Sequence, residues 1–469
     1  MIIDKTVLRC INGLMPLSII LILLFNGTLN AQKKDSILVN GQIQWSNDSI
    51  NYFPKKVIIK SKYNPSFIKI IAVDSIGTYK TSLDYGEYLV TPLSKYHWQR
   101  NWDQGYIRIN DSRSKVIIKI DSTSQINNHK LILDTLLLNS KIPEKGIISN
   151  LDSSAIKKLD DFINENLNYY QVPGASLAII KKGKVVYAKN YGVKNPITEE
   201  PITEETLFEA GSITKPVFAF AVMRLVERGI IDLDKPLYKY LEFEDVAHDK
   251  RYKLITARHV LSHQTGFPNW AERNKKGQFD LLFTPGTKFG YSGEGFEYLK
   301  RVIVHILGKD IETILREELI TPLNLNNFYF KTTDYVSENA SDGFYRGSPT
   351  KTRFVTEPGM AYSLMTTAKD FTKFAIAIRN RKGLSEETYN EMFKKQVSIN
   401  DNAYRGLGLE FGKDKAGNFY GHNGITRDFV TMYRYYPKLD IGYISFVNNI
   451  TGGWLAINTL KQFLMTGGN

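Results

Sequence analysis

The stretch Phe208-Glu-Ala-Gly-Ser-Ile-Thr-Lys215 leads into a strongly apolar segment that ends at Gly229. A serine at the start of a helix lies where the backbone dipole and the free N–H groups stabilise a developing negative charge. A lysine three residues later lies on the same helical face, one turn away. Ser212 and Lys215 can therefore form a nucleophile and its base, provided that burial lowers the pKa of the lysine.

The spacing Ser-x-x-Lys is weak support on its own, because a serine at a helix start is more often a cap than a nucleophile. The same spacing recurs at Ser66, Ser112, Ser154 and Ser348. Ser154 also begins an expected helix, but there the lysine faces solvent. Only Ser212 follows an apolar approach and enters a strongly apolar helix, which is the context that this chemistry requires.

Further motifs accompany this stretch in a fixed order, and together they are far more specific than any one of them. They are Val172-Pro-Gly174, Thr256-Ala-Arg-His-Val-Leu-Ser-His-Gln-Thr-Gly-Phe267, Pro285-Gly286, Phe289-Gly-Tyr-Ser-Gly293, Met365-Thr-Thr-Ala-Lys-Asp370 and Gly421-His-Asn-Gly424. Over about residues 155–465 the chain resembles the serine β-lactamase and penicillin-binding protein superfamily. The likeness is strongest to the branch of class C β-lactamases, D-alanyl-D-alanine carboxypeptidases and related esterases.

The resemblance implies an α/β (α+β) fold, in which helices flank an antiparallel sheet and a helical insertion interrupts it. It also implies a serine hydrolase that forms an acyl-Ser212 intermediate. In this family a tyrosine lies close to the nucleophile, and Tyr291 matches that position as general acid/base. The third family motif corresponds to His422, Asn423 and Gly424, where the glycine lets substrate approach the backbone and the histidine donates a hydrogen bond or tunes the proton relay.

By the same resemblance, the backbone N–H groups of Ser212 and Ile425 form the oxyanion hole. One position departs from the family pattern. Lactamases and peptidases carry asparagine two residues after the tyrosine, where it binds the amide side chain of a penicillin or peptide, and this chain has Gly293. The departure favours an ester, or a peptide that is held differently, and it leaves the choice among ester, D-amino-acid peptide and β-lactam open.

The chain is too long for one ordinary domain, so we expect two after the leader. Residues 32–145 alternate short β-like runs with turns and predict a small β-sandwich accessory domain. The runs are 37–45, 56–60, 67–73, 85–91, 115–120 and 130–138. Residues 150–469 form the hydrolase domain. There we expect a helix at 154–168, a hairpin of 175–180 and 185–191, helices over about 212–400, strands at 406–411, 419–423, 429–436 and 441–447, and a helix at 454–464.

Residues 1–31 read as a signal peptide, with a basic start, the apolar stretch Leu14–Phe25 and Ala31 before the cleavage point. The apolar stretch is shorter than the roughly 20 residues that span a bilayer, so we expect cleavage and no stable membrane span. The expected location is the periplasm or the medium, and an uncleaved anchor is the alternative. The single cysteine, Cys10, lies within this leader, which excludes thiol catalysis in the mature chain.

The net charge of +13 is spread along the chain without a Lys/Arg block or a zinc-finger signature. Nucleic acid is therefore not an expected partner. The seven histidines show no metal-binding spacing, and we expect neither a metal nor another cofactor. His259 and His263 are assigned structural roles. The expected partner is a small-molecule or peptide substrate, with a cell-wall fragment as one candidate.

Two competing functions remain at this point. A non-catalytic cell-wall-binding protein could keep the penicillin-binding scaffold, and Gly293 together with the added β domain motivates that reading. A metal-dependent hydrolase would need a ligand cluster, and the sequence offers none.

Overall fold

The computed structural model describes residues 37–45, 56–62, 68–75, 77–84, 86–92, 100–101, 105–106, 116–120, 126–133, 152–196, 198–345, 348–450, 452–461 and 464. The chain divides into two compact units, Met1–Leu136 and Leu137–Asn469. The expected signal peptide at 1–31 and the expected domain boundary at 145–150 lie outside the described residues.

The described part of the first unit consists of strands. One sheet has the order β4-β1-β9 and a second has the order β3-β2-β5-β8. The bounds are β1 Ile37–Trp45, β2 Lys56–Ser61, β3 Ile68–Ala72, β4 Thr78–Leu83, β5 Gly86–Pro92, β8 Val116–Ile120 and β9 Ile126–Leu133, with a small pair β6 Arg100–Asn101 and β7 Gly105–Tyr106. Strand β4 was not predicted from the sequence, and β9 begins four residues earlier than expected, at Ile126 rather than Lys130.

The second unit contains a nine-stranded antiparallel sheet of order β12-β11-β10-β22-β21-β20-β19-β18-β17. Strands from both ends of the segment meet at the pairing of β10 with β22, as the sequence predicted. The bounds are β10 Gly174–Lys181, β11 Lys184–Asn195, β12 Glu200–Pro201, β17 Val397–Asn400, β18 Ala403–Arg405, β19 Glu410–Asp414, β20 Gly417–Ile425, β21 Val430–Tyr436 and β22 Ile441–Val447.

The strand expected at 406–411 is wrong in position. The chain turns at residues 406–409, and strands β18 and β19 lie on either side of the turn. Gly408 has φ of +82°, and a Cβ on it would stand 2.2 Å from the Cβ of Ala219. The turn therefore needs glycine both for its left-handed backbone and for close packing on the helix that carries Ala219.

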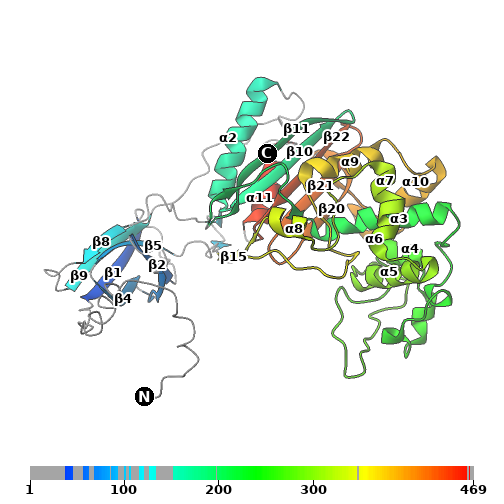
Figure 1. Ribbon diagram of the computed structural model, residues 1–469, viewed down its shortest axis with the longest axis horizontal. Helices are drawn as coiled ribbons and strands as arrows, with labels where there is room; N and C mark the ends of the chain where they lie inside the picture. The colour runs from blue at the N-terminus through cyan, green and yellow to red at the C-terminus, as the bar shows by residue number, and fades with distance from the viewer. Residues whose placement is uncertain are drawn as a thin grey trace, which may run out of the picture. The chain divides into compact units, whose positions relative to one another are not determined.

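Helices cover both faces of this sheet (Figure 1). On β10, Leu177 and Ile179 pack into one core with helices α2 (Ser153–Tyr169) and α11 (Gly453–Lys461). The alternate residues Ala178 and Ile180 face a second, larger core. Successive side chains of a strand point to opposite faces, and both faces of β10 are covered, so the strand is buried from Gly174 to Ile180. This explains its largely apolar sequence.

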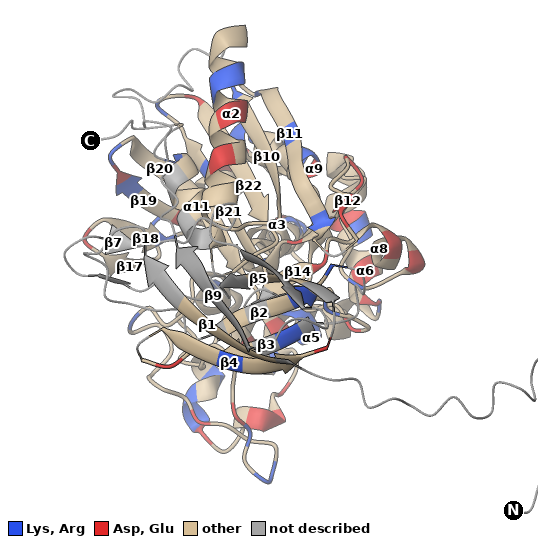
Figure 2. Cartoon of the chain, turned by 90° about the vertical axis from the view of Figure 1, so that its left-hand side faces the viewer, with Lys and Arg blue, Asp and Glu red and all other residues tan. Residues whose placement is uncertain are grey.

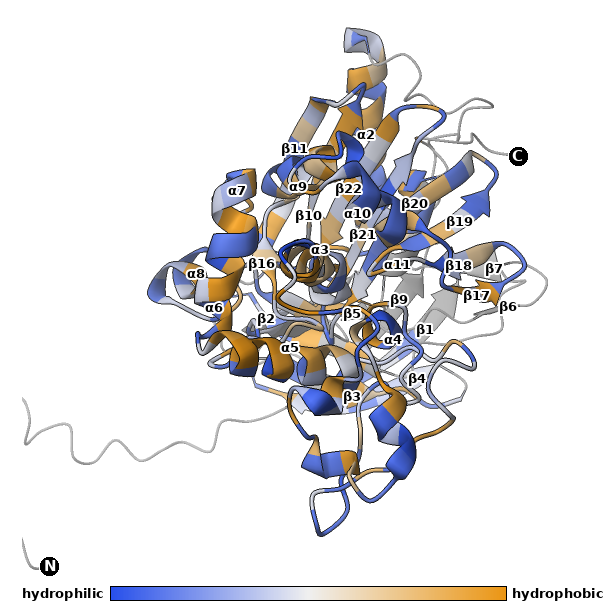
Figure 3. Cartoon of the chain, turned by 90° about the vertical axis from the view of Figure 1, so that its right-hand side faces the viewer, coloured by the Kyte–Doolittle hydropathy of each residue, from blue (hydrophilic) through white to orange (hydrophobic). Residues whose placement is uncertain are grey.

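The larger core surrounds helix α3 (Thr214–Glu227), which Figure 3 shows nearly end-on in the middle of the unit. A helix that is apolar on all sides is stable only when it is buried, and α3 is buried along most of its length. The helices around this core are α4 Ala257–Leu261, α5 Glu294–Leu307, α6 Ile311–Leu315, α7 Thr321–Leu323, α9 Ala368–Arg379 and α10 Glu386–Phe393. Helix α8 (Asp334–Asn339) instead packs through Val336 into a small separate cluster with Leu207 and Met365.

Charged residues of both signs lie mainly on outer helices and loops, whereas the central strands β22 and β21 carry few (Figure 2). Among the residues that the structure describes, no helix combines the length and the apolar character that crossing a bilayer requires.

Candidate active site

Ser212 lies in a short 3-10 turn, Gly211–Ile213, that leads directly into α3. The turn is held from both sides. The Thr214 hydroxyl donates to the Gly211 carbonyl at 2.7 Å and accepts from the Leu364 N–H at 3.0 Å. The half-buried Ser212 is thereby fixed at the N-terminal end of the helix, where the dipole favours a developing anion.

Lys215 is almost completely buried, with 1% of its surface exposed. Its Nζ lies 3.3 Å from Ser212 Oγ and donates to the Ala361 carbonyl at 2.8 Å. Burial lowers the pKa of Lys215 to about 7, Glu297 opposes this shift, and Arg405 adds to it. No carboxylate pairs with the ammonium group among the described residues. The structure thus supplies the buried amine that the sequence analysis required.

Tyr291 lies beside this pair, in the loop before α5. Lys215 Nζ stands 4.7 Å from the centroid of the tyrosine ring. Burial raises the pKa of Tyr291 to about 12, although the neighbouring Ser212 hydroxyl lowers it. At neutral pH the phenol is therefore protonated, and Lys215 is the group of the two with a pKa close to physiological pH.

His263 packs against the ring of Tyr291, in keeping with the structural role assigned to it. The two rings stack with centroids 4.2 Å apart. Nδ1 of His263 accepts the N–H of Ser292 at 3.1 Å, and its carbonyl accepts the N–H of Gly290 at 2.8 Å. Burial lowers the pKa of His263 well below its ordinary value, and the ring is neutral. The loop that carries Tyr291 is thus anchored on both sides of the tyrosine.

His422 is also buried and neutral. Burial, Arg405 and Lys215 together lower its pKa well below the ordinary value. Its Nδ1 lies 2.6 Å from the Asn423 carbonyl, which can only accept, so the proton of the neutral ring is on Nδ1. Nε2 has no partner among the described residues and is left as an acceptor, 3% of the residue being exposed. In this tautomer Nε2 can accept a hydrogen bond or tune the proton relay, but it cannot donate a hydrogen bond.

Strand β20 approaches the nucleophile with its backbone. A Cβ on Gly424 would stand 2.0 Å from the Ala210 carbonyl oxygen, and a Cβ on Gly211 would stand 3.1 Å from the N atom of Ile425. The Thr431 hydroxyl donates to the same Ala210 carbonyl at 2.8 Å. The two glycines therefore allow the backbone contact that brings the Ile425 N–H beside the Ser212 turn, as the expected oxyanion hole needs.

Gly293 is the N-cap of α5, and its N–H donates to the Asn269 carbonyl at 2.9 Å. A Cβ at this position would stand 2.7 Å from the indole ring of Trp270. The close contact with Trp270 thus explains locally why residue 293 is a glycine, and the sequence alone did not indicate this contact. Asn423 is half-buried, and its Oδ1 has no partner among the described residues.

Arg405 was not predicted as a site residue. It is 5% exposed, pairs with Glu410 at 3.2 Å, and places Cζ 5.6 Å from the centroid of the Tyr291 ring. Its Nε and Nη1 atoms have no partner in the described part of the chain. The sequence carries no signal for it, because Arg405 lies at the end of β18 and reaches the site only through the pairing of the sheet.

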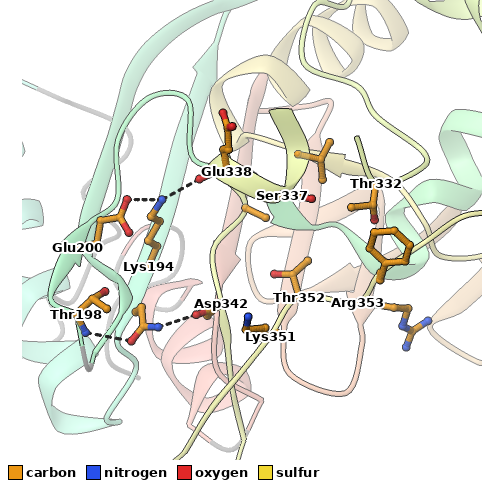
Figure 4. A pocket seen from close by; sticks show the side chains of 14 residues that line it. Lys194, Thr198, Glu200, Thr332, Ser337, Glu338, Asp342, Lys351, Thr352 and Arg353 are labelled. Carbon is orange, nitrogen blue, oxygen red and sulfur yellow. Dashed lines mark hydrogen bonds and ion pairs between the residues drawn. The ribbon is translucent and has the colours of Figure 1, made fainter. Parts of the chain in front are cut away.

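A separate cavity of about 560 Å³ lies at the β11–β12 edge, and Figure 4 shows its mixed polar lining. Lys194 pairs there with Glu200 and donates to the Glu338 carbonyl. None of the predicted site residues lines this cavity. Over the described residues, no group of three or more His, Cys, Asp or Glu side chains could hold a metal ion.

Residues 159–454 match the Beta-lactamase family. Protein flp of Staphylococcus aureus (strain NCTC 8325 / PS 47) is 23% identical over 325 residues, which is 64% of this chain and 64% of that protein, so the match spans less than two thirds of its length. Esterase EstB of Burkholderia gladioli is 24% identical over 317 residues, which covers 56% of this chain and 80% of that protein.

Among solved structures, the octameric penicillin-binding protein homologue from Pyrococcus abyssi is similar with a TM-score of 0.58 and 25% identity. The similarity covers 66% of this chain and 77% of that chain. It confirms the antiparallel sheet with flanking helices that the motifs predicted.

Proposed function

Because the chain belongs to the Beta-lactamase family, whose match covers more than half of its residues, we propose that it is a serine hydrolase that cleaves an ester or amide through an acyl-Ser212 intermediate. The observation that carries the proposal is the buried amine of Lys215, 3.3 Å from Ser212 Oγ, with a pKa of about 7. A neutral amine at that distance can accept the serine proton as the hydroxyl attacks.

In the proposed reaction, Ser212 Oγ forms a bond to the substrate carbonyl carbon while its proton passes to Lys215. The carbonyl oxygen becomes an oxyanion that the N–H groups of Ser212 and Ile425 stabilise. The tetrahedral intermediate then expels the alcohol or amine, which takes a proton from Tyr291, and the phenol regains one from Lys215. Water repeats these steps on the acyl-enzyme and releases the acid.

The proposal favours an ester over a penicillin or a peptide. Gly293 provides no side chain where the lactamases and peptidases use asparagine, and the similarity to an esterase of Burkholderia gladioli supports the same choice. Turnover of a short-chain ester, a chromogenic cephalosporin and a D-alanyl dipeptide, measured side by side, separates the three substrates.

A fluorophosphonate probe followed by peptide mass mapping tests the nucleophile. We expect label on Ser212 and expect both Ser212→Ala and Lys215→Ala to lower turnover by orders of magnitude while the fold is kept. Ser154→Ala is a matched control, because Ser154 also begins a helix three residues before a lysine, and that Lys157 is exposed and paired with Asp161 at 2.8 Å. Label on another serine contradicts the proposal.

A second candidate is a non-catalytic cell-wall-binding protein, which Gly293 favours because the usual asparagine is missing. It predicts binding of cell-wall fragments without probe labelling or turnover of any ester, peptide or lactam.

We further propose that the protein is exported to the periplasm or the medium, on the basis of residues 1–31. N-terminal sequencing of the protein from those compartments should begin at Gln32. A start at Met1 in a membrane fraction supports the uncleaved anchor instead.

A further inference from the structure

Trp270 is half exposed and lies against the loop that carries Tyr291. The indole ring occupies the space directly above Gly293, where a Cβ would stand 2.7 Å from two of its ring carbons. The residue is 51% exposed, which is unusual for so large an apolar side chain. Its neighbour Asn269 accepts the N–H of Gly293, so backbone and ring are held together at this point.

Tyr362 extends this aromatic surface from a different segment. Its ring meets the Trp270 ring edge to face, with centroids 5.6 Å apart. Tyr362 directly follows Ala361, whose carbonyl accepts the Lys215 ammonium group and whose N–H donates to Glu297 at 3.0 Å. Trp270 thus packs on the segment that carries Tyr291. Tyr362 is the chain neighbour of Ala361, whose carbonyl binds Lys215.

The Tyr362 ring also contacts a second side chain, that of Arg353. The guanidinium carbon of Arg353 lies 4.9 Å from the ring centroid, a distance at which the cation is attracted to the ring. Two partners therefore restrict this ring before any ligand arrives. A preformed aromatic surface loses little side-chain entropy when it binds a ligand, so its contacts contribute more fully to affinity.

We propose that Trp270 and Tyr362 form a subsite that selects esters with a flat apolar substituent, such as a phenyl ring, on the acyl or the alcohol side. The inference rests on the proposed function and adds the substrate class. Aromatic rings prefer edge-to-face or offset packing on other aromatic rings, and two rings at an angle offer both surfaces. The indole also covers the position from which a polar side chain at residue 293 would reach an amide.

Two matched substrate series test the subsite. In the acyl series, 4-nitrophenyl phenylacetate is compared with 4-nitrophenyl acetate, and in the alcohol series benzyl acetate is compared with ethyl acetate. We expect the wild-type protein to prefer the phenyl-bearing ester, by kcat/KM, in at least one series. In that series Trp270→Ala should lower the ratio of the two kcat/KM values by about three- to tenfold, the range that one aromatic contact contributes.

Gly293→Ala is a second variant that keeps the tryptophan. Its new methyl group must displace the indole, so the kcat/KM ratio should fall as in Trp270→Ala. Leu439→Ala removes an exposed apolar side chain from the turn between β21 and β22 and serves as the matched control, with the ratio unchanged.

Ser212→Ala separates a failure of the aromatic subsite from a failure of the proposed function. If its turnover of these esters equals that of the wild type, the proposed function fails. If Ser212→Ala abolishes turnover but the ratios in Trp270→Ala and Gly293→Ala stay within twofold of wild type in both series, the aromatic subsite is wrong and the serine chemistry stands.

Discussion

At the scale of single residues, the site depends on Lys215, whose positive charge is energetically unfavourable because the side chain is buried. Lys215 lies on α3, and its Nζ stands 5.4 Å from the Phe296 ring centroid and 4.7 Å from the Tyr291 ring centroid. Within the part of the chain that the structure describes, its hydrogen-bond partners are one carbonyl and one hydroxyl. Removal from water penalises the ammonium form, so the pKa falls from that of an ordinary lysine to about 7. The nearby cation Arg405 and anion Glu297 act on it in opposite directions.

These opposing charges predict opposite shifts of the pH profile. Only neutral Lys215 accepts the serine proton, so kcat/KM should rise as pH increases through about 7. Glu297→Gln removes the charge that raises the lysine pKa and should move this acidic limb to lower pH. Arg405→Met removes the charge that lowers the pKa and should move the limb to higher pH.

The measurement is kcat/KM against pH for one ester. Glu386→Gln changes an equally charged residue whose side chain is 83% exposed, and it should leave the profile in place. Shifts of Glu297→Gln and Arg405→Met in the same direction would contradict the assignment of Lys215 as the group that titrates.

At the scale of elements, backbone contact between strand β20 and the turn before α3 builds the oxyanion site. Because Gly424 and Gly211 have no side chains, strand β20 and the turn can approach each other closely. The pairing of β13 (Phe208–Glu209) with β16 (Met365–Thr366) holds the same turn from the other side. The nucleophile is thus fixed between two strand contacts that come from distant parts of the chain.

Gly424→Ala should therefore impair catalysis more than folding. The new methyl group would stand 2.0 Å from the Ala210 carbonyl oxygen, so the Ile425 N–H must move away from Ser212. We expect kcat to fall by about 10²- to 10³-fold, as when one oxyanion donor is lost. Steady-state kinetics measure the loss, and circular dichroism checks the fold.

Asn418→Ala, an exposed position on the same strand, is the control and should keep wild-type kcat. Near-normal kcat in Gly424→Ala would mean that Ile425 does not contribute to the oxyanion hole.

At the scale of the whole molecule, the unit that contains the site has a hydrophobic core on each face of its nine-stranded sheet. Helix α3 lies inside the larger core, and this depth is what removes Lys215 from water. The same burial that activates the lysine lowers the stability of the fold while the amine is charged.

Lys215→Met should consequently stabilise this unit, and the gain should depend on pH. The pKa of Lys215 is about 7 in the folded state and near 10.5 when the chain is unfolded, so between these values the unfolded state binds the extra proton. Wild-type stability therefore rises with pH over this range relative to the variant. The difference in the free energy of unfolding should be largest at pH 7 and below and should close towards pH 10.

Calorimetry of the transition of this unit at several pH values measures the difference. Lys157→Met, at an exposed position, is the matched control and should show no such trend. A difference for Lys215→Met that is constant from pH 7 to 10 would show that Lys215 keeps an ordinary pKa in the folded protein.

The sequence by itself was sufficient for features that depend on neighbours along the chain. The apolar helix after Ser212, the strand pattern of β10, β21 and β22, and the order of the motifs follow from local periodicity and spacing. The spacing of Ser212 and Lys215 follows from the turn of one helix, and the place of Tyr291 from its flanking motif.

Only the tertiary structure decided what lies around those residues. Arg405, Glu297, Ala361 and Trp270 come from four separate elements or loops. No spacing along the sequence indicates that the first three act on Lys215 and that Trp270 packs on Gly293. The pKa of Lys215 and the space above Gly293 depend on burial and on side chains packed from distant segments. Desolvation and steric contact act between residues that are close in space, so they can be inferred only from the folded structure.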